Sequence, residues 1–170
     1  MTTDHIKPLL DPSYVEGLDA RPTDTLRAMK SDCVNVETSV SYYRRLAQAR
    51  IEILDAEVER RRAGGSVEDL IAQLPSILAG DSGRASNSQT RLAEPNAPVL
   101  ELRFTDGRER LINDTTLANL PTLDDAGLAS VRAELSEFER DLSDVRHRLH
   151  EVLDAVEHEI ALRQAAATSG

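Results

Sequence analysis

The sequence predicts a mainly α-helical protein: a long antiparallel two-helix coiled coil with a short intervening helix, a disordered linker and a small β-hairpin. Three observations support this fold class. Apolar residues recur at steps of three and four in two long stretches, which is the spacing of paired helices. The polar pattern of the first stretch is repeated in the second. A content of 3% aromatic residues, with no Trp among 170 residues, suits a thin helical assembly better than a thick globular core.

The first part of the chain predicts a flexible arm followed by a long helix. Residues 1–24 combine Pro, Gly and short apolar pairs without a sustained period, which favours a mobile tail over an arm that docks on a partner. Residues 25–63 are expected to form the first coiled-coil helix, because Gly64 and Gly65 supply a stop signal after it. The three arginines at 60–62 favour the negative end of that helix, although they also offer a small basic patch.

The middle of the chain predicts three shorter segments. Residues 64–79 read as a short helix that starts at a capping pattern and is bent or ended at Pro75. Residues 80–98 are rich in Gly, Ser, Asn and Pro and are expected to be a disordered linker. Residues 99–113 predict a β-hairpin, because VLELRF and RERLI flank a Thr-Asp-Gly turn. The second coiled-coil helix then spans residues 122–165.

Each long helix carries a row of apolar residues that we expect to form the seam between the helices. The steps of three and four are those of a two-stranded coiled coil. The first seam is Val36, Val40, Tyr43, Ala47 and Ile51, and the second is Leu128, Val131, Leu135, Phe138, Leu142, Val145, Leu149, Val152 and Val156.

Beside each seam runs a stripe of five polar residues, and the two stripes have the same spacing. Because a helix turns about 100° per residue, each set lies within a band roughly 80° wide. In an antiparallel pair, a two-fold axis perpendicular to the plane of the helices places both stripes on one face. We therefore expect a pseudo-two-fold polar face suited to a two-fold-symmetric polar ligand. The stripes are Glu37, Ser41, Arg44, Gln48 and Glu52, and Glu139, Ser143, Arg146, His150 and Asp154.

The stripes also have a purely structural interpretation. Positions beside a coiled-coil seam are commonly charged, so the two sets are also explained as the solvated flank of the helix pair. Five matched positions in two helices, including Ser and Gln or His that add little to helix stability, favour a function instead. The pattern alone leaves both interpretations open.

Composition narrows the classes of function. A net charge of −10 and a pI near 4.9 argue against a general nucleic-acid or membrane-surface binder, because such binding needs clustered Lys and Arg. Local arginines still leave room for a small anion. Cys33 is the lone cysteine, so no intramolecular disulfide is expected. The lack of a long apolar run predicts a cytoplasmic protein.

Catalysis and metal binding find little support in the sequence. It contains no nucleophile elbow, Walker loop, dinucleotide-binding glycine pattern or cysteine pair. A two-helix hairpin also lacks the deep pocket needed to shift the pKa values of its many carboxylates. Histidines in an acidic exposed helix are usually solvated, so we expect neither a metal nor a cofactor, although one helix carries His147, His150, Glu151 and His158.

The doubled motif Glu-x3-Ser-x2-Arg-x3-Gln-x3-Asp resembles the signature of RsiG, the family of cyclic-di-GMP-dependent anti-sigma factors of sporulating actinomycetes. The string SYYRRLAQARIEIL looks like that family as well. The resemblance covers both long helices and their order around the linker. The sequence departs at Glu52, where Asp is expected, and this lengthens the carboxylate arm. It also departs at His150, where Gln stands in the pattern, and this introduces a pH-sensitive group.

The resemblance implies a ligand of two intercalated cyclic-di-GMP molecules that lie on the stripes and bridge the protein to a sporulation sigma factor. Guanine offers N7 and O6 acceptors to the arginines, which alternatively stack on the base or bind phosphate. Carboxylates would accept from guanine N1 and N2, and the remaining side chains would complete contacts to bases or phosphates. The implied roles are Arg44 and Arg146 as donors, Glu37, Glu139, Asp154 and Glu52 as acceptors, and Ser41, Ser143, Gln48 and His150 as supporting contacts.

We therefore consider one main hypothesis and two rivals. The main hypothesis is an anti-sigma factor that sequesters its sigma subunit only when cyclic-di-GMP is present and so represses transcription, without contacting nucleic acid or membrane itself. The first rival is a ligand-independent coiled-coil adaptor or a self-assembling structural protein. The second, weaker rival is a metal-dependent enzyme.

Overall fold

The computed structural model describes residues 5–79, 100–104, 107–113 and 118–168, and within them the regular elements are all helical. None of these described residues lies in a β-strand. The elements are α1 (Ile6–Leu9), η1 (Pro12–Val15), η2 (Leu18–Ala20), α2 (Thr23–Ala63), α3 (Val67–Ala79), α4 (Glu109–Ile112), η4 (Leu120–Thr122) and α6 (Asp125–Thr168). The prediction of two long antiparallel helices that pack together is confirmed. The linker expected at residues 80–98 lies outside the described residues.

The described residues of the β-hairpin predicted for residues 99–113 contain no strand, so this prediction is wrong for them. Residues 101–104 have no regular structure, and the RERLI stretch contributes the helical turn α4 instead of a second strand. The apolar alternation does bury Leu102 and Phe104, each 2% exposed. Their segment is held by α2, because the Leu100 backbone N–H donates to Ser39 Oγ at 3.1 Å. Apolar alternation thus identified the buried side chains, although the segment that carries them is not a strand.

The chain divides into two compact units, and the divisions fall within both long helices. Unit 1 comprises Met1–Tyr42, Ala97–Gly107 and Asp141–Gly170, and unit 2 comprises Tyr43–Asn96 and Arg108–Arg140. Each unit therefore contains part of α2 and part of α6. The described helices include none with both the length and the apolar character that crossing a membrane requires.

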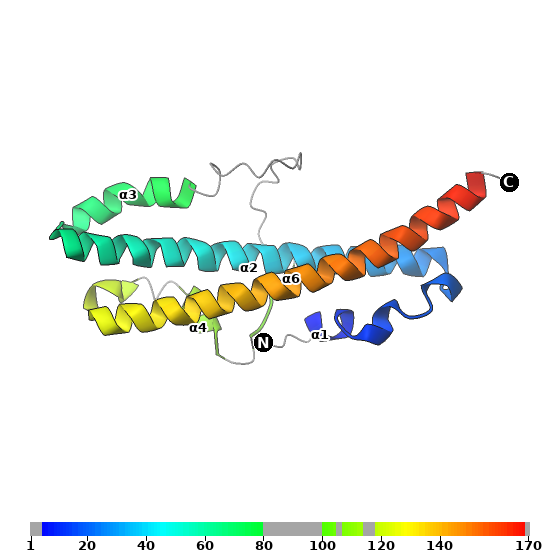
Figure 1. Cartoon of the computed structure of the whole chain (residues 1–170), viewed down its shortest axis with the longest axis horizontal. Helices are drawn as coiled ribbons and strands as arrows, with labels where there is room; N and C mark the ends of the chain where they lie inside the picture. Colours follow the sequence, from blue (N-terminus) through cyan, green and yellow to red (C-terminus); the bar gives the residue numbers. More distant parts are fainter. Residues whose placement is uncertain (1–4, 80–99, 105–106, 114–117, 169–170) are drawn as a thin grey trace. The chain divides into compact units, whose positions relative to one another are not determined.

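In unit 1, the first part of α2 packs against the last part of α6, and the N-terminal segment lies beside them (Figure 1). The core includes Leu26, Met29 and Val156, onto which Tyr14 and Leu18 of the N-terminal segment pack. An ion pair of 2.7 Å between Lys30 Nζ and Glu157 Oε1 joins the two helices at the surface.

Arg163 of α6 fastens the N-terminal segment to unit 1. Its guanidinium donates to the backbone oxygens of Arg21 at 2.6 Å, Leu18 at 2.8 Å and Asp19 at 3.0 Å. Glu159 on the same helix holds the guanidinium through a 2.7 Å bond. The flexibility that the sequence predicts for residues 1–24 stays a prediction, and these contacts define what any such motion must break.

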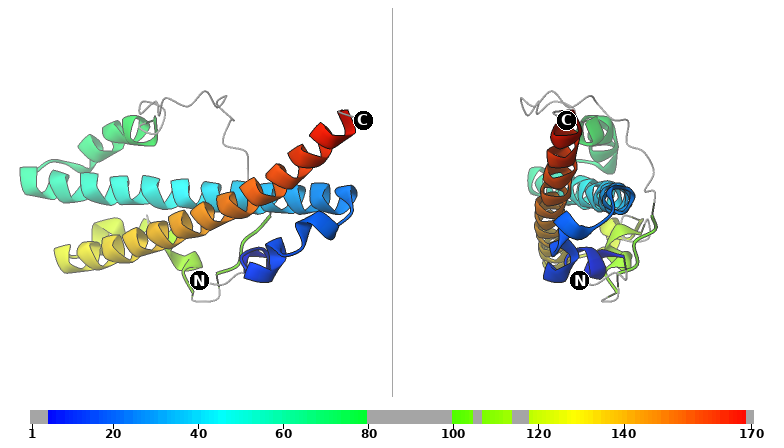
Figure 2. Two further views of the ribbon diagram at one scale, coloured as in Figure 1. Left: turned by 45° about the vertical axis from the view of Figure 1, so that its right-hand side comes forward. Right: turned by 90° about the vertical axis from the view of Figure 1, so that its right-hand side faces the viewer.

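In unit 2, α3 lies along α2 on the side away from α6 (Figure 2). A capping box starts α3: the Ser66 backbone N–H donates to Asp69 Oδ2 at 2.7 Å, and the Asp69 N–H donates to Ser66 Oγ at 3.3 Å. The helix continues through Pro75 to Ala79, so the proline does not end it.

The buried seam of α2 follows alternating steps of three and four. It is formed by Leu26, Met29, Cys33, Val36, Val40, Tyr43, Ala47, Arg50, Leu54 and Glu57. The sequence predicted Ile51 after Ala47, but Ile51 is only half-buried and Arg50 takes the seam position. The regular heptad spacing therefore outweighs side-chain polarity at this position.

Glu57 binds the arginines that follow it at the C-terminal end of α2. The carboxylate accepts from Arg60 at 2.7 and 2.8 Å and from Arg61 at 2.7 Å. Arg61 also donates to the backbone oxygens of Leu123 at 2.7 Å and Leu120 at 3.2 Å, just before α6 begins. Hydrogen bonds from Arg60, which outweigh the opposing effect of burial, lower the pKa of Glu57 to about 2. Arg61 thus holds the turn before α6, and Arg60 donates to the Gly65 backbone oxygen at 2.6 Å, so both arginines serve the fold rather than a basic patch.

Candidate functional site

In unit 1, four stripe residues from both helices meet around one carboxylate. This Glu37 cluster consists of Glu37 and Ser41 from α2 and Arg146 and His150 from α6. Glu37 Oε1 accepts from Ser41 Oγ at 2.7 Å and from Arg146 Nε at 2.9 Å. The same oxygen lies 3.3 Å from His150 Nε2. Steps of three and four bring these side chains to the flank of the helix pair, beside the seam.

The Glu37 carboxylate is held in its ionised form. Burial alone would raise its pKa, but the hydrogen bonds from Ser41, Arg146 and His150 and the charge of Arg146 outweigh it, so the pKa of Glu37 is lowered from 4.5. The side chain is 22% exposed, whereas Arg146 is 40% and His150 is 46% exposed. The cluster is therefore an anchored anion with two solvent-accessible nitrogen groups beside it.

In unit 2, a second group of stripe residues repeats this arrangement. The Glu139 cluster consists of Glu139 from α6 and Arg44 and Gln48 from α2. Glu139 Oε1 accepts from Arg44 Nη1 at 3.2 Å and from Gln48 Nε2 at 3.1 Å. Arg44 and Glu139 are 21% and 22% exposed, and the buried Arg44 Nε atom has no hydrogen-bond partner. This arginine keeps a donor that its present contacts do not satisfy.

The two clusters correspond position by position. Glu37 and Glu139 both stand first in their stripes, and each meets the third and fourth members of the opposite stripe. In unit 1 those members are Arg146 and His150, and in unit 2 they are Arg44 and Gln48. The repeat in the sequence is therefore also a repeat of contacts between the helices.

The other three predicted site residues lie further along the same two stripes or between the members already named. Glu52 and Asp154, the last members of their stripes, are exposed, and each stands one helical turn beyond its cluster. Ser143 is half-buried on α6, one turn before His147. Seven of the ten predicted residues thus meet in the two clusters, and the ligand-binding role of all ten stays a prediction.

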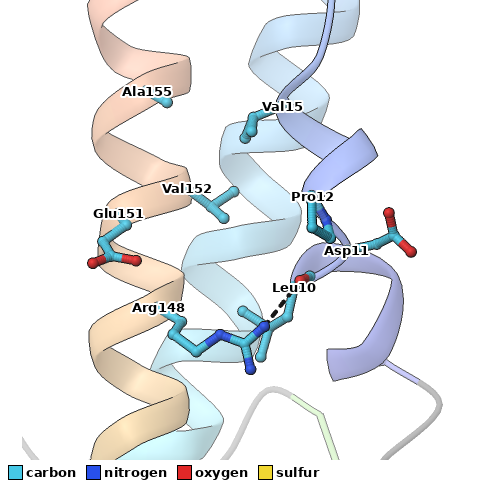
Figure 3. Close-up of a pocket in the computed structure, with 8 residues that line it drawn as sticks. All are labelled: Leu10, Asp11, Pro12, Val15, Arg148, Glu151, Val152 and Ala155. Atoms are coloured by element: carbon cyan, nitrogen blue, oxygen red, sulfur yellow. Dashed lines mark hydrogen bonds between the residues drawn. The ribbon is translucent and has the colours of Figure 1, made fainter.

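Unit 1 also contains a cavity, and no residue of the polar clusters lines it (Figure 3). It has a volume of about 230 Å³ and is lined by Leu10, Asp11, Pro12, Val15, Arg148, Glu151, Val152 and Ala155. Arg148 donates to the Leu10 backbone oxygen at 3.0 Å across it. None of the stripe residues lines this cavity, so we place the candidate site on the open clusters.

The described residues contain no group of three or more His, Cys, Asp or Glu side chains arranged to hold a metal ion. His147 instead lies 3.4 Å from Glu151, one turn further along α6. The clusters offer a different chemistry, because each sets a carboxylate acceptor beside a guanidinium and a third nitrogen group. Such a set matches a polar ligand that carries donors and acceptors on neighbouring edges.

Comparison with known families identifies the chain. A model of the RsiG-like family matches residues 12–78 and 114–169, which is most of the sequence. The chain belongs to the RsiG-like family. Membership of the RsiG-like family implies the role of an anti-sigma factor, which is regulatory rather than enzymatic. Among curated proteins, no match to the chain was found.

The RsiG-like match includes both Glu clusters, since it covers α2 and α6. The segment around Leu102 and Phe104, which packs on α2, falls between the two matched regions. Sequence reasoning also missed several residues that position the helices, above all Ser39, Glu57 and Arg163. A signal existed for Glu57, because it continues the regular spacing of the α2 seam.

Proposed function

We propose that this RsiG-like protein is an anti-sigma factor that binds a cyclic-di-GMP dimer through the Glu37 and Glu139 clusters and then sequesters a sporulation sigma factor. Family membership supports the anti-sigma role. The observation that carries the ligand is the duplicated meeting of a glutamate from one helix with an arginine from the other. Cyclic-di-GMP is itself a two-fold ligand with two guanines.

The chemistry of each cluster suits a guanine. One edge of guanine carries the acceptors N7 and O6, which the planar fork of Arg44 or Arg146 is shaped to bind. The other edge carries the N1 and N2 donors, for which Glu37 or Glu139 is an acceptor. An adenine lacks the O6 acceptor and presents a donor there, so the same arginine would meet an unfavourable edge.

The ion pairs within the clusters are a modest obstacle to the ligand. Arg146 and Glu37 are 40% and 22% exposed, and Arg44 and Glu139 are exposed to a similar or smaller extent. Partly exposed ion pairs contribute about 0–1 kcal/mol, whereas a hydrogen bond to a charged group contributes about 1.5–3 kcal/mol. A guanine that engages both partners therefore offsets the loss of the pair that it separates.

Ligand dependence of sigma capture follows from the openness of the clusters. Each is a few polar groups on a helix surface, where single hydrogen bonds contribute little net free energy. A sigma factor that contacts the same bound ligand adds contacts that neither protein provides alone. We therefore expect little complex without cyclic-di-GMP and a large gain with it.

A second candidate function is a ligand-independent coiled-coil adaptor. The observation that favours it is that Glu37 and Glu139 are already satisfied by arginines of the opposite helix. Cross-helix ion pairs of this kind also occur beside seams that bind no ligand. The adaptor predicts sigma or partner binding that is unchanged by cyclic-di-GMP.

Calorimetric titration with cyclic-di-GMP, with and without a sporulation sigma factor, tests the proposal. Arg44→Ala and Arg146→Ala should each weaken ligand binding by about 1.5–3 kcal/mol while circular dichroism stays unchanged, because each removes a charge-assisted hydrogen bond outside the seam. Arg62→Ala is the matched control, since Arg62 is 72% exposed at the end of α2 and pairs with Glu59.

Wild-type affinity in the Arg44→Ala/Arg146→Ala double variant would remove the clusters from the ligand site. Strong sigma binding in the absence of ligand would favour the adaptor. Binding of the ligand without any effect on sigma capture would leave the clusters as a nucleotide site and end the anti-sigma proposal.

A further inference from the structure

The Glu37 and Glu139 clusters differ in the chemistry of their third member. His150 Nε2 lies 3.3 Å from Glu37 Oε1, and Gln48 Nε2 lies 3.1 Å from Glu139 Oε1. The two nitrogens thus occupy equivalent places. A glutamine amide keeps the same donors and acceptors at every physiological pH, whereas an imidazole changes its charge between about pH 5 and 8.

The surroundings of His150 contain few other groups that titrate in that range. Carboxylates are ordinarily ionised above pH 6, and arginine is always charged. The exception is His147, which is 79% exposed and lies beside Glu151. The charged or titratable groups near His150 are Glu37 from α2 and Arg146, His147, Glu151 and Asp154 from α6.

We propose that the Glu37 cluster takes up a proton at His150 when it binds an anionic guanine nucleotide, whereas the Glu139 cluster, with Gln48 in the same place, does not. The inference rests on the proposed function and adds a regulation of that same site. The two half-sites would then respond differently to pH although they recognise the same chemical group.

The direction of the effect follows from charge. A neutral imidazole has one N–H donor, whereas the protonated ring has two donors and a positive charge. Cyclic-di-GMP carries two negative phosphodiesters, so the complex favours the protonated ring. In the free protein the ring nitrogen faces one carboxylate oxygen at 3.3 Å and the side chain is 46% exposed, so a bound phosphodiester adds a negative charge that the free cluster does not have. Affinity should therefore rise as the pH falls through the imidazole range.

Calorimetry in two buffers of different ionisation enthalpy measures the proton directly. The wild-type protein should take up a fraction of a proton on binding cyclic-di-GMP near pH 7, and its affinity should fall about three- to tenfold between pH 6 and pH 8. His150→Gln should remove the uptake and flatten the pH profile. Gln48→His should add a second uptake, because it places an imidazole beside Glu139.

His147→Gln is the matched control, because it removes the other nearby histidine of α6 but leaves the Glu37 cluster intact. It should retain the wild-type proton uptake. Equal uptake by wild type and His150→Gln, or release of a proton by the wild type, would overturn the inference and leave the proposed function standing. Absence of cyclic-di-GMP binding at every pH would overturn both.

Discussion

Each unit of the protein contains one glutamate–arginine cluster, but different contacts hold the rest of the two units together. In unit 2 the support is the buried carboxylate of Glu57, which binds Arg60 and Arg61, and Arg61 in turn binds backbone oxygens of the turn before α6. In unit 1 the support is Arg163, which binds backbone oxygens of the N-terminal segment. In unit 2 a buried anion binds arginine side chains, whereas in unit 1 a cation binds backbone carbonyl oxygens.

This contrast shows that the repeat duplicates the candidate site and not its surroundings. The stripe residues recur with fixed spacing in both helices, and their contacts recur as well. The Glu57 contacts belong to unit 2, and the Arg163 contacts belong to unit 1. We therefore expect substitutions in the clusters to have similar effects in both units, and substitutions in the supports to have local effects.

The largest effect is expected from charge reversal at the centre of either cluster. Glu37→Arg or Glu139→Arg removes the acceptor and sets a second positive charge beside Arg146 or Arg44, so ligand-dependent sigma capture should be abolished. Size-exclusion chromatography of both proteins, with and without cyclic-di-GMP, measures it. Glu59→Arg, at a 71% exposed position of α2, is the control and should leave capture intact.

The outcome for the single variants also sharpens the comparison between the clusters. Loss of capture in both means that each cluster is required for the ligand-bound complex. Half-strength capture by each would show two independent sites, and full capture by one variant would restrict the function to the other unit.

A smaller effect, on stability, is expected from Glu57→Gln. Removing the charge of a buried carboxylate that binds two arginines should lower the free energy of unfolding by about 2–3 kcal/mol. Glu59→Gln, which changes an exposed carboxylate nearby, should cost less than about 0.5 kcal/mol. Urea denaturation at pH 7 measures both, and equal values for the two variants would show that the Glu57 network contributes nothing special.

The same network should give the protein a defined acid response. Because the folded pKa of Glu57 is about 2, below the ordinary value of 4.5, its stabilisation is complete above pH 4.5 and is lost as the pH falls toward 2. Glu57→Gln should therefore flatten this part of the stability profile. Glu37, whose pKa is also lowered, contributes in the same direction and remains in the variant.

The smallest effect is expected from Arg163→Ala. Loss of its bonds to Leu18, Asp19 and Arg21 should cost about 1–2 kcal/mol and should act mainly on the N-terminal segment. Hydrogen exchange should accelerate in residues 6–20 and stay unchanged in residues 43–63. Arg148→Ala, which removes one bond to Leu10, is the milder control. Acceleration in unit 2 as well would contradict the local role.

The long helices were predictable because burial imposes a period that the sequence displays. The first seam was right from Val36 to Ala47 and wrong at Ile51, since hydrophobicity favours isoleucine while the heptad steps favour Arg50. The predicted hairpin was right about which side chains are buried and wrong about the secondary structure of the segment. Alternation along Leu102 and Phe104 reports which side chains are buried, but it is silent on whether a strand or a helix covers them.

The position of the stripe residues beside the seam was predictable, whereas their contacts were not, and their role in binding a ligand stays a prediction. Equal spacing in both stripes placed Glu37 and Arg146 on one flank, and the structure shows that they bind each other. The attachment of the N-terminal segment had no signal in the sequence, because Arg163 binds backbone oxygens, which every residue possesses. Contacts of that kind leave no pattern of side chains to find.

The buried Arg50 and Glu57 have a consequence for how the helices of unit 2 align. Both occupy seam positions that leucine or valine fills elsewhere along α2, at 3% exposure each. A slip of α2 along α6 by one heptad would preserve most apolar contacts, and Glu57 would keep Arg60 and Arg61, which lie on its own helix. It would, however, part Arg61 from the backbone oxygens of Leu120 and Leu123 that it now binds. The misaligned pairing is thereby penalised. The contact of Arg61 with the turn before α6, which Glu57 orients, thus marks the register of the helix pair in which Arg44 and Gln48 bind Glu139.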